Sequence, residues 1–92
     1  MGVYLNDTSQ QHNNRPVYIL DRGGQFMYYN DEGRWVMGSM VGGGGGVGIS
    51  TLQTGLLTPP ATGWRYWDDG QWKEDTQLTV SESGVLFVSY EE

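Results

Sequence analysis

The chain has 92 residues, a net charge of −6 and no cysteine, and these values exclude several classes of protein. A chain of this length folds as one small domain with a modest core, so residues 1–92 are expected to form a single domain. Nucleic-acid binding requires clustered Lys and Arg, whereas the five basic residues here are scattered. No apolar run approaches the ~20 residues that a membrane helix needs. We therefore expect neither nucleic-acid binding nor membrane insertion.

Short runs of β-branched and aromatic residues alternate with Gly, Asp and Asn, which is typical of an all-β domain. The polar segment 10–15 is expected to be a loop, and the segment at the N-terminus an edge strand. About six to eight short strands would form an antiparallel meander, as an open sheet, a sandwich or a partly closed barrel. Strands are predicted over residues 17–20, 26–30, 34–39, 47–52, 64–67, 72–75, 78–80 and 85–90.

Residues 41–48 contain five consecutive glycines and are expected to form a flexible loop. The glycine spacing formally fits a phosphate-binding pattern. That pattern needs a helix directly behind it, and "ISTLQTG" does not begin one. The turn "SESG" before the last strand is a second loop that ends in glycine, and residues 84–92 are expected to add a C-terminal strand.

Two segments, "YNDEGRW" at 29–35 and "YWDDGQW" at 66–72, share one frame. Each could hold a two-residue loop or a three-residue loop whose glycine is left-handed. The three-residue loop places the Tyr opposite the Trp in both copies, so we favour it. In the two-residue alternative, Trp67 would lie opposite Trp72 and the likeness would be lost. The structural residues of these two corners are then Tyr29, Gly33, Trp35, Tyr66, Gly70 and Trp72.

In the favoured register, Trp67 and Arg65 point away from the Tyr66–Trp72 pair, toward solvent or a second layer. An exposed Trp beside an Arg is a plausible contact surface, although aromatic side chains also serve as core. Trp72 is expected to be core. The candidate ligand-binding residues are Trp67, Arg65, Trp64 and Tyr28.

Several short motifs occur along the chain in the same order as in a known kind of module. Asn14-Arg15-Pro16-Val17-Tyr18, Trp35-Val36-Met37-Gly38 and Trp64-Arg65-Tyr66-Trp67-Asp68-Asp69-Gly70 occur in the order of a "GRPVY … W-x-IG … W-x-YWDG … LTV" pattern. Over about residues 13–80, the chain resembles a small all-β module that recurs in multidomain eukaryotic proteins. The resemblance implies a compact all-β module and speaks against an enzyme. It names no ligand and no functional residues.

Chemical groups for catalysis are sparse in the sequence. His12 is the single histidine and falls in the predicted loop, so neither a catalytic triad nor a histidine-rich metal site is expected. Asp68 and Asp69 could contribute to a weak calcium site, but acids in turns are commonly just solvated. We expect no metal, no cofactor and no enzymatic activity.

Two functions remain. The first is a recognition module that binds a protein or a carbohydrate through exposed aromatics. The alternative is a structural subunit that forms homo-oligomers by pairing of sheet edges, for which the apolar "GVLFVSY" would supply a free edge.

Overall fold

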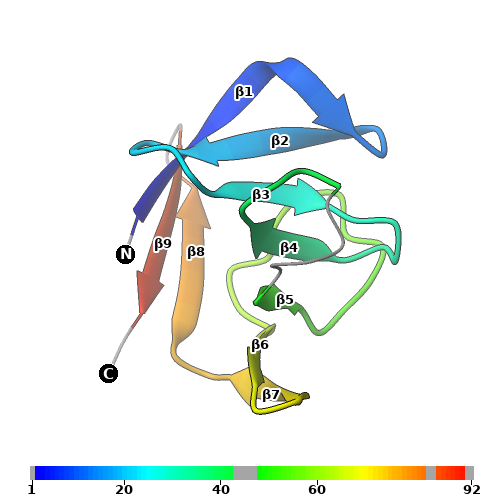
Figure 1. The fold of residues 1–92 in the computed structure, drawn as a ribbon. Helices are drawn as coiled ribbons and strands as arrows, with labels where there is room; N and C mark the ends of the chain where they lie inside the picture. The colour runs from blue at the N-terminus through cyan, green and yellow to red at the C-terminus, as the bar shows by residue number, and fades with distance from the viewer. Residues whose placement is uncertain (1, 43–47, 83–84, 91–92) are drawn as a thin grey trace.

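The described residues of the chain, 2–42, 48–82 and 85–90, form one antiparallel nine-stranded sheet in this computed structural model (Figure 1). The all-β prediction is confirmed: both the N-terminal segment and the short segment before Leu52 pair, as expected, and nine strands are present in the described part of the chain where about six to eight were expected. The strands are β1 (Gly2–His12), β2 (Arg15–Leu20), β3 (Phe26–Tyr29), β4 (Trp35–Gly38), β5 (Ile49–Thr51), β6 (Trp64–Asp68), β7 (Gln71–Asp75), β8 (Leu78–Glu82) and β9 (Leu86–Tyr90).

The sheet curls into a partly closed barrel. Its strand order is β7-β6-β5-β4-β3-β2-β1-β9-β8, so the two edge strands, β7 and β8, follow each other directly in the chain. The backbone N–H of Val80 in β8 donates to the carbonyl of Ala61, which precedes β6, over 2.9 Å. The short connection between the two edges therefore holds the ends of the sheet near each other without a closing ladder.

Both terminal strands are interior to the sheet, which corrects two predictions. β1 lies between β2 and β9 rather than at an edge, and β9 lies between β1 and β8. The apolar C-terminal strand exists as predicted, but its two sides are paired. The sequence could not show this because the β1–β9 ladder joins the two ends of the chain.

The predicted loop at 10–15 is also wrong, because β1 continues to His12 and β2 begins at Arg15. Asn13 and Asn14 make a two-residue turn with φ of 53° and 61°, a left-handed pair that Asn tolerates better than most residues. β1 bends sharply (Figure 1) where its pairing shifts between Asp7 and Gln11.

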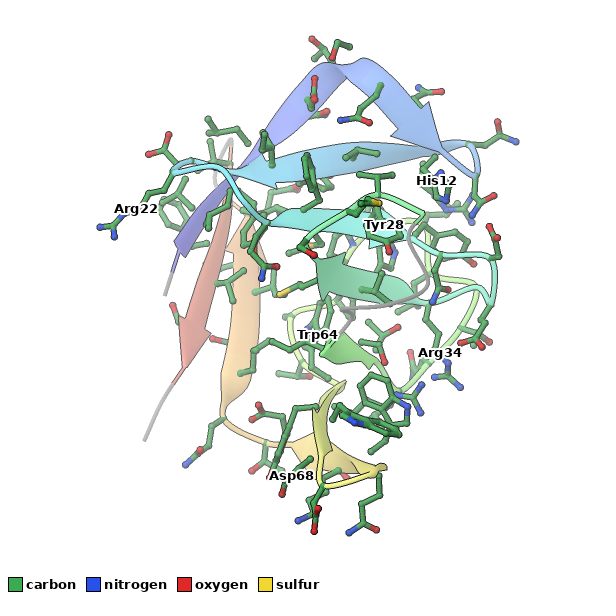
Figure 2. The ribbon with its side chains drawn as sticks, in the orientation of Figure 1. His12, Arg22, Tyr28, Arg34, Trp64 and Asp68 are labelled. Carbon is green, nitrogen blue, oxygen red and sulfur yellow. The ribbon has the colours of Figure 1, made fainter. Side chains whose placement is uncertain are left out.

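The main core fills the inside of the curved sheet. Trp35 and Trp64 are both fully buried there, and Trp64 is seen within the curve of the sheet in Figure 2. The indole N–H of Trp35 donates to the carbonyl of Leu56, and that of Trp64 to the carbonyl of Pro60, each over 3.0 Å. These two bonds tie the long β5–β6 loop to the core. The buried members of the cluster are Tyr4, Tyr18, Met27, Trp35, Met37, Trp64, Leu78, Val80, Leu86 and Val88.

A second, smaller cluster lies on the outer face of β2, β3 and β4. Val17, Tyr28 and Val36 are buried in it, with Val41 packed against them. The ring of His12 meets the Tyr28 ring edge-on, with 5.5 Å between centroids. His12 therefore ends a strand and packs on the sheet. Residues 43–47 of the predicted glycine loop and Ser83-Gly84 of the predicted turn lie outside the described residues.

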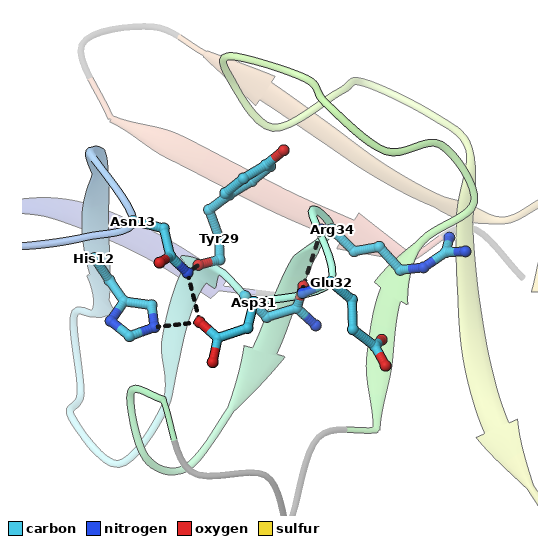
Figure 3. A network of polar contacts seen from close by, with 7 residues as sticks. His12, Asn13, Tyr29, Asp31, Glu32 and Arg34 are labelled. Atoms are coloured by element: carbon cyan, nitrogen blue, oxygen red, sulfur yellow. Dashed lines mark hydrogen bonds and ion pairs between the residues drawn. The ribbon is translucent and has the colours of Figure 1, made fainter.

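The first corner has the predicted three-residue loop. Tyr29 lies opposite Trp35, and Gly33 is left-handed with φ of 81°. The side chain of Asn30 accepts the backbone N–H groups of Glu32 and Arg34 at 3.0 and 2.9 Å. Figure 3 shows the Asn13 amide donating to the start of the same loop, at the carbonyl of Tyr29 and the carboxylate of Asp31.

The second corner has the two-residue loop, so the predicted Tyr66–Trp72 pair is wrong. Trp67 lies opposite Trp72, and Tyr66 opposite Lys73. Asp69 and Gly70 form the loop with φ of 50° and 81°, both left-handed as a type I′ turn requires. The turn preference of Asp-Gly, rather than the likeness between the two segments, therefore sets the register of the second hairpin. In this register Trp72 lies on the outer face, beside Trp67.

We predict that Gly33→Ala and Gly70→Ala each lower the free energy of unfolding by about 1 kcal/mol or more, because Cβ is penalised at positive φ. At Gly33 the added Cβ would also meet the Tyr29 hydroxyl at 3.3 Å. Gly48→Ala is the control, since Gly48 lacks a positive φ and a Cβ there meets nothing within 4 Å. Urea titration of the three variants measures the effect. Equal midpoints for all three would contradict the assigned turns.

Candidate functional site

Two tryptophans lie side by side on the outer face of the β6–β7 hairpin. Trp67 and Trp72 face each other across the ladder, with ring centroids 5.4 Å apart and planes 75° apart. Trp67 is 51% exposed, and Trp72 is partly buried. A ring that is half exposed at a fixed position is available for contact with another molecule.

Arg65 completes this surface from the next outward-facing position of β6. Its guanidinium carbon lies 4.2 Å from the centre of the Trp72 ring, within cation–π range. Its Nε donates to the buried hydroxyl of Ser50 over 2.7 Å, which fixes the plane of the guanidinium. The two terminal NH₂ groups have no partner among the described residues. We call Arg65, Trp67 and Trp72 the aromatic platform.

A second guanidinium lies near the platform. Burial, followed by the positive charge of Arg34, lowers the pKa of Arg65, and the carboxylate of Glu32 partly opposes this. Both arginines stay charged at neutral pH. Arg34 donates to the carbonyls of Thr51 and Leu52 over 2.7 and 2.8 Å, so its position is set by β5. Two guanidiniums, Arg65 and Arg34, therefore lie near two carboxylates, Glu32 and Glu74, beside the platform.

The end of the same hairpin is polar. Lys73 donates to Asp68 over 2.8 Å, and both side chains are about half exposed. Asp68 is thus engaged with a cation, and among the residues with described structure no three acidic or histidine side chains gather as a metal site would need. Glu74 lies opposite Arg65 in the ladder. Glu74 therefore shares the outer face with the platform, whereas Asp68 and Lys73 alternate to the other face of the hairpin.

The structure separates the four candidate ligand-binding residues. Trp67 and Arg65 share the outer face, as expected. Trp64 is 0% exposed and belongs to the core, and Tyr28 is 1% exposed and lies in the outer cluster, so neither can contact a ligand at the surface. Trp72 was assigned to the core and instead belongs to the platform. The Asp-Gly pair at 69–70 was the signal that could have shown this.

The aromatic residues of the two predicted corners also lie on different faces of the sheet. Tyr29 and Trp35 pack against each other inside the sheet, with ring centroids 5.6 Å apart. Tyr66 takes the same face of β6 as Trp64 and lies opposite Ile49 of β5. The first corner is therefore part of the core, whereas the second presents aromatic rings outward.

No protein-family model matches the chain, and neither a curated protein nor a solved structure matches it. The resemblance to a recurrent all-β module thus stays a prediction. In the part of the chain with described structure, no helix is long and apolar enough to cross a membrane.

We predict opposite effects for two neighbouring tryptophans of β6. Trp64→Ala should lower the free energy of unfolding by about 3–5 kcal/mol, because it opens a cavity and frees a bonded loop. Trp67→Ala should cost no more than about 1 kcal/mol, the scale of an exposed cross-strand pair. Thermal melts of both variants measure this. A larger loss for Trp67→Ala would show that the faces of β6 are assigned the wrong way round.

Proposed function

We propose that this chain is a non-catalytic recognition module that binds a carbohydrate on the aromatic platform. The observation that carries the proposal is the half-exposed Trp67 ring, held beside Trp72 and an anchored Arg65. A large apolar ring left exposed on a small domain costs free energy in solution. Binding of a partner offsets that cost.

The chemistry of the platform suits a sugar ring. One face of a pyranose carries C–H groups, which pack against the electron-rich face of an indole. Sugar hydroxyls and carboxylates need donors at the edge of that contact, and Arg65 has terminal N–H groups for this purpose. Because the Nε of Arg65 is held by Ser50, little side-chain entropy is lost on binding.

A protein partner is the competing possibility and is less favoured. A stable protein interface covers about 800 Å² on each partner around an apolar centre. Here the outer face of the hairpin carries the two indoles beside Arg65 and Glu74, whereas Asp68 and Lys73 alternate to the other face. A narrow aromatic surface with charged neighbours on one side fits a flexible polar chain better than a broad protein surface.

Self-assembly through sheet edges loses its main support. The apolar β9 was expected to offer the pairing edge, yet it lies between β1 and β8. The edge strand β7 carries charged side chains at Lys73 and Glu74, which oppose pairing with another copy.

A glycan array probed with the parent chain, followed by calorimetric titration of the bound glycans, tests the proposal. Trp67→Ala should weaken binding of those glycans at least tenfold. Arg65→Lys should weaken it less, because charge remains while the planar stack on Trp72 is lost. Phe87→Ala is the matched control, since Phe87 is another aromatic of the outer surface, 39% exposed on β9, and should bind as the parent does.

Two results would contradict the proposal. The first is the absence of any bound glycan on the array. The second is equal affinity of the parent and Trp67→Ala for every glycan that does bind, which would place the contact elsewhere. Capture of a protein by the parent but not by Trp67→Ala, without glycan binding, would favour the competing possibility.

A further inference from the structure

A cavity of about 370 Å³ lies inside the partly closed barrel, away from the aromatic platform. Figure 1 shows β8 and β9 facing β4 and β5 across the inside of the curved sheet, and residues of all four strands line this space. The cavity therefore lies between the two sides of the curled sheet. Its wall residues include Tyr4, Leu20, Met37, Ile49, Leu78 and Val88.

The cavity has a physical cause in the sequence. Gly2 and Gly48 line it; a Cβ at Gly2 would meet Leu20 Cδ1 at 2.7 Å, so only Gly48 leaves space that a side chain could fill. A Cβ at Gly48 would meet nothing within 4 Å, so there is open space at that position. Leu20 and Ile49 belong to the inward-facing set, yet they are only partly buried. Apolar surface is thus left uncovered on the inside of the domain.

The cavity is open to solvent on one side, so its apolar walls are partly in contact with water. Apolar surface that stays in water forfeits roughly 25 cal/mol per Å² of the stabilisation that burial gives, and a small domain has little stability to spare. An apolar molecule in the cavity covers that surface. A volume of this size also falls within the range of about 300–1,000 Å³ typical of small-molecule sites.

The lining defines the chemistry of the occupant. The cavity residues in the described part of the chain include no Asp, Glu, Lys, Arg or His, so a charged ligand would lose hydration without compensation. Two polar side chains are present, Tyr4 and the exposed Gln25. Burial raises the pKa of Tyr4, and no hydrogen bond contributes to that shift. The Tyr4 hydroxyl is not among the buried polar atoms left without a partner, so it reaches solvent and can exchange water for a ligand as hydrogen-bond partner.

We propose that this cavity binds a small, uncharged and mainly apolar molecule that carries one hydrogen-bonding group for Tyr4. A cavity of about 150 Å³ holds a benzene, so the larger volume here fits a bicyclic ring or a short branched chain. The site is separate from the aromatic platform, and either can exist without the other.

Titration with 1-naphthol, an uncharged bicyclic alcohol, tests the proposal through the methionine methyl signals in NMR. Met37 lines the cavity, and Met40 is 65% exposed and serves as the internal control. The Met37 methyl signal should shift saturably while that of Met40 stays in place. Naphthalene-1-sulfonate, which has the same rings and a charge, should leave the Met37 signal unchanged at equal concentrations.

Substitutions in the cavity wall test whether 1-naphthol binds inside the cavity. Ile49→Phe and Leu20→Phe each fill part of the cavity and should weaken 1-naphthol binding at least tenfold. Tyr4→Phe should weaken it about 2- to 10-fold, the range of one hydrogen bond, while naphthalene should bind the parent and Tyr4→Phe alike. Trp67→Ala should bind 1-naphthol as the parent does, so failure of the carbohydrate proposal and failure of this one are distinguishable.

The parent titration decides the question even if a filling variant does not fold. A Met37 signal that does not saturate overturns the proposal. Undiminished binding to a folded Ile49→Phe or Leu20→Phe chain overturns it as well, and so does loss of binding in Trp67→Ala, which would place 1-naphthol on the platform.

Discussion

Two buried indoles hold this small domain together. Trp35 and Trp64 are fully buried on the inner face of the sheet, and their N–H groups bond to the carbonyls of Leu56 and Pro60. Without disulfides, a domain of this length depends on a few large side chains for its core. Each ring fills part of the core and also lies beneath the loop 52–63, to which its N–H group is bonded. The two rings therefore hold this loop against strands β4, β5 and β6.

The strict alternation of a β-strand then produces the outer surface. With Trp64 fixed inward, Arg65 and Trp67 must point outward, and the two-residue turn at Asp69-Gly70 brings Trp72 beside Trp67. Ser50 faces the same way on the next strand and anchors Arg65. The platform is therefore a consequence of core packing on the opposite face. The barrel cavity lies on the inner face, between β8 and β9 on one side and β4 and β5 on the other.

The sequence was informative where pattern and turn chemistry agree. The central meander of β2, β3 and β4 and the C-terminal hairpin could be predicted from their β-branched runs and turns. The second corner was mispredicted because the likeness of two segments was preferred to the Asp-Gly turn signal. β1 extends through the polar stretch up to His12 because it gains ladder bonds from β2, and its pairing with β9 spans the chain. Local patterns carry no information about such long-range pairing.

Hydrogen exchange of the four tryptophan indole N–H groups, followed by NMR, tests the central claim that alternate faces of the sheet separate core from platform. The N–H groups of Trp35 and Trp64 should exchange slowly, because both are buried and bonded to loop carbonyls. Those of Trp67 and Trp72 should exchange fast, because neither is bonded among the described residues and Trp67 is half exposed. Slow exchange at Trp67 together with fast exchange at Trp64 would contradict the claim.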